Sequence, residues 1–162
     1  MNAAFGPCSN FGLLYGCIVD ARHLQGSFTV NTSITMNQPG VTLLLGPARF
    51  LVNAVTSGNY FLYITAQSSK VLGVGRTDPF AGGGFATIIQ IGFDNIQTIG
   101  ANVIGSGASE ATWLRNVEIG NLDIRISNGL NGRTALWVEN VTNSYFHDIS
   151  LFSPLLISWR VS

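Results

Sequence analysis

Two stretches of this sequence repeat one another at a spacing that few architectures allow. Trp113–Val117 (WLRNV) resembles Trp137–Val141 (WVENV), 24 residues further on, and Ile119–Ile124 resembles Phe146–Leu151, 27 residues further on. A period of about 20–50 residues is the signature of solenoids, propellers and repeat arrays. The offset changes because the second copy carries extra residues before Phe146, and solenoids tolerate such insertions at their turns.

The residues inside each repeat alternate as they do in a β-strand. Leu122, Ile124 and Ile126 fall on one side of such a strand, and Asp123 and Arg125 fall on the other. No stretch shows the apolar spacing and capping residues of an amphipathic helix. A propeller repeat is longer, at about 40 residues, and a sandwich would not repeat the same residues at the same turn. The pattern therefore predicts an all-β parallel solenoid.

The expected organisation is one domain. Residues 1–39 are predicted to form an N-terminal cap and the first strands, and residues 40–162 to form about five coils of roughly 21–30 residues each. We expect these strands to lie in parallel sheets of one solenoid: Val41–Leu45, Val71–Val74, Leu122–Ile126 and Ile149–Phe152. The segment SWRVS shows no sign of closing the helix, so the solenoid is expected to be incomplete at its C-terminus and able to self-associate through that open end, unless Leu155–Ser162 folds back as a plug.

The composition excludes several classes of protein. Charged residues make up only 10% of the chain and the formal net charge is zero, so neither disorder nor a nucleic-acid-binding surface is expected. The apolar run Phe11–Val19 is shorter than the roughly 20 residues that a membrane helix needs. No Lys or Arg precedes Arg22, so no signal peptide is recognisable. Cys8 and Cys17 fit no zinc-binding spacing, and the sequence leaves open whether they are free thiols or a disulfide.

Asparagines recur at the predicted corners. Asn116 and Asn140 occupy matching positions of the two repeats, and Asn121 matches Asp148 in the same way. Asn tolerates the left-handed backbone conformation of a sharp corner. Stacked Asn side chains also hydrogen-bond to one another along a strand stack. We therefore predict a structural ladder that contains Asn116, Asn140 and Asn121.

The segments "GCIVDARHLQGSFTVNTSITMNQPGVTLLLGPARFLV", "LYITAQSSKVLGVGR" and "LRNVEIGNLDIRI" resemble the first coils of bacterial right-handed parallel β-helix proteins of the pectin-lyase-like superfamily. The resemblance implies a right-handed helix, a polysaccharide partner and a secreted or cell-surface location. It also implies either a polysaccharide lyase or glycoside hydrolase, or a non-catalytic adhesin-type or structural helix. The polygalacturonase strings "NTD", "DD", "GHG" and "RIK" are absent, and no carboxylate cluster suggests a calcium site, so neither a metal nor a cofactor is expected.

The predicted coils and the family resemblance together suggest candidate site residues. Glycoside hydrolysis uses two carboxylates facing one groove, about 5–10 Å apart, and Asp123 and Asp148 form the best catalytic pair because they come from successive coils. Arg125 could hold a sugar carboxylate and His147 could move a proton or bind substrate. Trp159, like Tyr145, could offer a flat ring on which a sugar stacks.

Overall fold

Strands make up nearly all the regular structure of this protein. The computed structural model describes residues 16–52, 60–75, 86–91, 97–102, 110–126, 134–152 and 158–161. The only helical element in these ranges is a single 3-10 turn, Glu110–Thr112. The expected all-β class is therefore confirmed for the described residues. The strands are β1 (Cys17–Ala21), β2 (Gly26–Val30), β3 (Ile34–Met36), β4 (Val41–Leu45), β5 (Ala48–Val52), β6 (Tyr60–Ile64), β7 (Lys70–Leu72), β8 (Ile88–Ile91), β9 (Gln97–Asn102), β10 (Leu114–Arg115), β11 (Glu118–Ile126), β12 (Thr134–Glu139), β13 (Val141–Thr142), β14 (Tyr145–Phe152) and β15 (Ser158–Val161).

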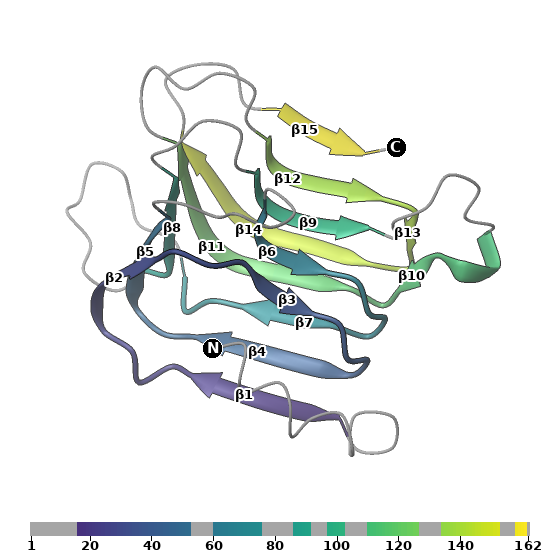
Figure 1. Ribbon diagram of the computed structural model, residues 1–162, viewed down its shortest axis with the longest axis horizontal. Helices are drawn as coiled ribbons and strands as arrows, with labels where there is room; N and C mark the ends of the chain where they lie inside the picture. The colour runs from purple at the N-terminus through teal and green to yellow at the C-terminus, as the bar shows by residue number, and fades with distance from the viewer. Residues whose placement is uncertain are drawn as a thin grey trace.

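All pairings between these strands are parallel, and they form three stacks and one separate pair, β10 with β13. The first stack runs β1, β4, β7, β11 and β14. The second runs β2, β5 and β8 and continues on the second halves of β11 and β14. The third runs β3, β6, β9, β12 and β15. Since the chain visits each stack in turn, as Figure 1 shows, the arrangement is compatible with a parallel β-helix.

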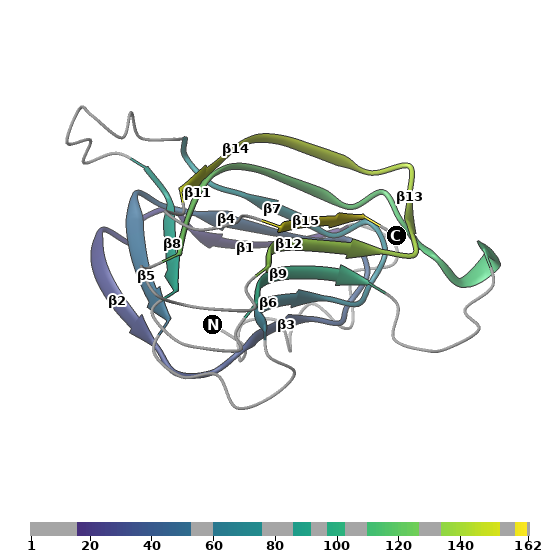
Figure 2. The same cartoon turned by 90° about the horizontal axis from the view of Figure 1, so that it is seen from above.

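The stacks enclose one apolar interior. Figure 2 shows the stack that contains β7, β11 and β14 across the interior from the stack that contains β6, β9 and β12, with β5 and β8 on a third side. The alternation in β4 sends Val41, Leu43 and Leu45 inward, where each is at most 2% exposed. Phe50 packs between Phe28 and Phe61, with ring centroids 6.2 and 6.1 Å apart. Burying this apolar surface is the main stabilising term of the fold.

The corners use residues with left-handed backbone. Asn116, Asn121, Asn140, Asn143 and Asp148 all have φ between 49° and 59°, a region that Asn and Asp tolerate better than other side chains. The register corrects the predicted ladder. Leu114 pairs with Val141, and Asn143 Nδ2 donates to Asn116 Oδ1 across the two coils. Asn143, and not Asn140, is therefore the neighbour of Asn116, because the structural offset between these coils is 27 residues.

Cys17, the first residue of β1, is disulfide-bonded, and no cysteine among the described residues is a free thiol. Cys8, the other cysteine of the chain, lies outside the described residues.

Candidate functional site

The outer face of β7, β11 and β14 carries a connected group of charged and aromatic side chains. The register places Lys70, Glu118 and Tyr145 at neighbouring positions of the three strands. Val71 and Ile119, the next residues along β7 and β11, are fully buried in the core. Because side chains alternate along a strand, Lys70, Glu118 and Tyr145 face outward.

A glycine gives the histidine of this face its position. His147 is in register with Gly120, and a Cβ built on Gly120 would overlap Cε1 and Nε2 of the imidazole and lie 2.9 Å from its Cδ2. The ring of His147 therefore lies over the backbone of β11, in space that any other residue at position 120 would fill. Sequence inspection missed Gly120, although the 27-residue alignment pairs it with His147.

Four charged or polar groups join into one line, which we call the charged chain: Lys70, Glu118, His147 and Asp148. Lys70 Nζ lies 2.7 Å from Glu118 Oε2. The other carboxylate oxygen of Glu118 lies 3.4 Å from His147 Nε2, and His147 Nδ1 lies 3.0 Å from Asp148 Oδ2. The imidazole thus stands between two carboxylates that come from successive strands of the stack.

The pKa values of His147 and Glu118 shift in opposite directions. The hydrogen bond to Asp148 raises the pKa of His147, burial opposes this effect, and the bond to Glu118 adds to it. The hydrogen bond from Lys70 lowers the pKa of Glu118. Burial of the carboxylate opposes this shift, and the hydrogen bond to His147 adds to it. These shifts favour an imidazolium beside an ionised carboxylate, since each charge stabilises the other.

A flat aromatic ring adjoins the charged chain. Tyr145 is 63% exposed, and its ring stacks on that of His147 with centroids 4.5 Å apart and planes 20° apart. The stacked pair fixes the orientation of an otherwise exposed tyrosine. The sequence predicts Tyr145 as an exposed platform, and its ring is exposed in the structure.

The predicted carboxylates Asp123 and Asp148 make different contacts on different parts of β11 and β14. Asn121, with φ 58°, bends β11, so that residues before it pair with β7 and residues after it pair with β8. Asp123 lies after the bend, in register with Ser150; it is 3% exposed. It forms an ion pair of 3.2 Å with Arg125. Asp148 instead contacts His147, so the alternation expected from a straight strand does not extend across the corner.

The remaining predicted residue, Trp159, lies on β15, in register with Leu136, and its side chain is outside the described part. Another aromatic group lies on the outer side of the third stack. Tyr60 stacks on Tyr63 at 4.8 Å and meets Trp137 edge to face at 6.4 Å. Trp137 and Tyr63 are half-buried in this group, because they alternate with the inward-facing Leu62, Ile64, Leu136 and Val138.

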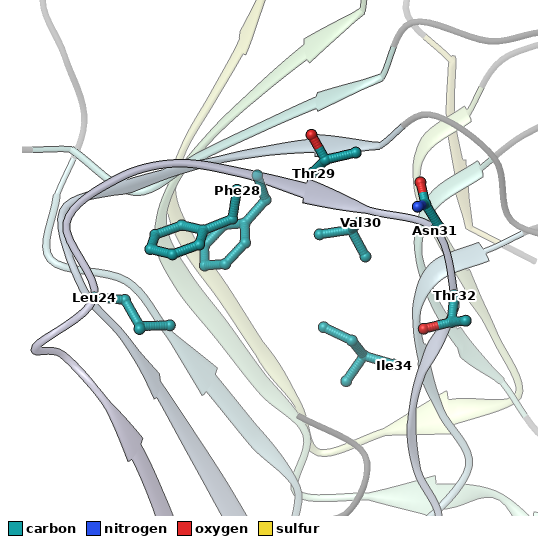
Figure 3. Close-up of a pocket in the computed structure, with 8 residues that line it drawn as sticks. Leu24, Phe28, Thr29, Val30, Asn31, Thr32 and Ile34 are labelled. Atoms are coloured by element: carbon teal, nitrogen blue, oxygen red, sulfur yellow. The ribbon is translucent and has the colours of Figure 1, made fainter.

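A cavity of about 240 Å³ opens at the first strands. Figure 3 shows Leu24, Phe28, Val30 and Ile34 directed toward a common space. No residue that lines the cavity is titratable, and its apolar members belong to or pack against the core. Among the described residues, the cavity is therefore continuous with the apolar interior and is lined by no acid, base or thiol.

In the ranges that the structure describes, no three His, Cys, Asp or Glu side chains are grouped so as to hold a metal ion. A search of the same ranges finds no helix with the length and apolar character to cross a membrane.

The comparisons with known proteins give no relative. The sequence matches no protein-family profile, no curated protein and no solved structure. The class that the structure itself defines is an all-β protein of stacked parallel strands with a polar and aromatic site on one outer face.

Proposed function

We propose that this chain forms about five coils of a right-handed parallel β-helix of the pectin-lyase-like kind, and that it binds polysaccharide on the outer face of β7, β11 and β14. The resemblance in sequence and the three parallel stacks support the fold. The observation that carries the function is Tyr145: an exposed ring, fixed by stacking on His147, beside a row of hydrogen-bonding groups. A sugar ring has an apolar face that stacks on aromatics and a rim of hydroxyls that bond to charged groups.

We also propose that the protein is secreted or displayed at the cell surface. The disulfide at Cys17 supports this location, because disulfides persist mainly in oxidising compartments outside the cytosol.

Replacement of Tyr145 tests the binding proposal. Tyr145→Ala should weaken oligosaccharide binding about two- to tenfold, the factor that corresponds to about 0.5–1.5 kcal/mol of stacking. Phe152→Ala is the matched control, because Phe152 is an exposed aromatic at the other end of the same strand. Calorimetric titration with a panel of neutral and acidic oligosaccharides gives the affinities. Equal loss in the two variants would count against a site at Tyr145.

A second candidate function is cleavage of the bound glycan, as a hydrolase or lyase. In this reaction His147, with its raised pKa, is the proton donor, and the ionised Glu118 is the base. Release of reducing ends or of unsaturated products should then be abolished in His147→Gln and Glu118→Gln while Phe152→Ala keeps it. Binding without any product would leave the non-catalytic, adhesin-type alternative.

A further inference from the structure

The cations on the proposed binding face are already engaged by carboxylates. Glu118 contacts Lys70 with one oxygen, at 2.7 Å, and His147 with the other, at 3.4 Å. The second nitrogen of His147 contacts Asp148 at 3.0 Å. A single side chain, Glu118, thus binds both of the cations that a carboxylate of an acidic sugar would need.

The exposed charges of this face are Lys70 at one end, with its side chain 48% exposed, and Asp148 at the other. The side chain of Asp148 is 57% exposed, whereas that of His147 is only 18% exposed. An acidic sugar placed on Tyr145 would meet the carboxylate of Asp148 before it reached the imidazolium. It would also compete with Glu118 for Lys70, so that two carboxylates would share one ammonium group.

We infer that Glu118 is a specificity-determining residue that makes this site accept uncharged sugars and reject uronic acids. The inference rests on the proposed function, since it assigns the substrate class of the same site. Of the two cleavage reactions it leaves only hydrolysis, because elimination by a lyase needs the carboxylate of a uronic acid. It follows from like-charge repulsion near a partly buried carboxylate, a form of discrimination that suppresses the wrong ligand and does not strengthen the right one.

Two other cations lie on neighbouring elements and do not change this conclusion. Arg22, beside β1, is paired with Asp20 at 2.6 Å. Arg115 is exposed on β10, which pairs with β13 and lies before the corner at Asn116. Arg115 is therefore a suitable control position near the site.

The test uses pairs of oligosaccharides that differ only in a hydroxymethyl or a carboxylate group at the sixth carbon: glucan and glucuronan, mannan and mannuronan, galactan and galacturonan. The folded wild type should bind the neutral member of a pair at least about tenfold more tightly, a difference typical of one unfavourable charge contact. Glu118→Gln, which keeps the shape of the side chain, should remove or reverse this preference because it releases Lys70 and His147. Arg115→Gln should keep it.

Lys70→Gln is a second variant, with the opposite expected effect on the preference for neutral sugars. Its result does not depend on whether Glu118→Gln folds. Lys70→Gln removes one of the two positive charges beside Glu118, so the preference for the neutral sugar should persist or grow. A preference of the wild type for the uronic acid, or an unchanged ratio in Glu118→Gln with a normal circular dichroism melt, would overturn the inference and leave the binding proposal intact. If neither wild type nor Glu118→Gln binds any member of the pairs, the binding proposal fails and this inference fails with it.

Discussion

Gly73 and Gly120 touch one another across β7 and β11, where Gly73 N–H donates to the carbonyl oxygen of Gly120 at 3.0 Å. Neither has room for a side chain, but the obstacle differs. A Cβ on Gly73 would overlap the backbone carbonyl of Asn121 and lie 2.8 Å from both Leu122 and Thr87. A Cβ on Gly120 would meet only the ring of His147. Backbone in a packed sheet cannot move aside, whereas an imidazole can rotate away.

Alanine at these two glycines should therefore give different results. Gly73→Ala should lower the free energy of unfolding by about 1–3 kcal/mol, the usual cost of overpacking. Gly120→Ala should cost less, but it should displace His147 and bring the pKa of its imidazole back toward the ordinary value. Chemical denaturation measures the first effect and NMR titration of His147 the second. An unchanged histidine titration in Gly120→Ala would show that the ring does not depend on this glycine.

Asp123 should matter for stability and not for ligand binding. It is buried and paired with Arg125 at 3.2 Å, and removal of one partner of a buried ion pair leaves a charge that burial penalises. We expect Arg125→Met to cost about 1–3 kcal/mol. Arg49→Met should cost less, because Arg49 is exposed and bonds the neutral Gln90. Loss of glycan binding in a stable Arg125→Met protein would restore Arg125 to the binding site.

At the scale of strands, the sequence predicted where strands form and that they run parallel better than it predicted the register between them. Val41–Leu45 coincides with β4, and the other three predicted strands lie within or next to β7, β11 and β14, because inward apolar residues alternate clearly there. The match of WLRNV to WVENV was misleading. Trp113 precedes β10 while Trp137 lies within β12, so the same letters lie in different stacks. The alignment of Ile119 with Phe146 is the register that the structure shows. Extended by one residue toward the N-terminus, the same alignment places Glu118 beside Tyr145.

The bond between Asn116 and Asn143 should hold the β10–β13 corner together. Asn143→Leu should lower the free energy of unfolding by about 1–3 kcal/mol, because Leu disfavours positive φ and leaves Asn116 without this bond. Asn143→Gly keeps the backbone conformation and isolates the cost of the hydrogen bond. Asn140→Gly is the control, since Asn140 also has positive φ but lies one position before β13. If both glycine variants melt together, the side-chain bond contributes nothing measurable.

At the scale of the whole molecule, strand stacking brings together groups that are far apart in sequence. Lys70 and Glu118 meet because β7 pairs with β11, and Glu118 and His147 meet because β11 pairs with β14. The charged chain therefore crosses three strands of one stack and exists only when that stack is assembled. Its protonation is coupled to folding for the same reason, since the unfolded chain keeps none of these contacts.

This coupling predicts a stability maximum at mildly acidic pH. The pKa of His147 is raised from its ordinary 6.5, so its contribution is fully present below pH 6.5 and is lost as the pH rises through the higher value in the folded protein. The pKa of Glu118 is lowered from 4.5, so its contribution is present above pH 4.5 and is lost as the pH falls through the lower value in the folded protein. Both contributions are therefore complete between pH 4.5 and 6.5.

Urea denaturation across this range and above it should show stability falling on the alkaline side in the wild type. His147→Gln should make stability nearly independent of pH on the alkaline side. Glu118→Gln should reduce the pH dependence on both sides, because it removes the titrating carboxylate and one partner of His147. An alkaline limb as steep in His147→Gln as in the wild type would show that another group controls the pH dependence.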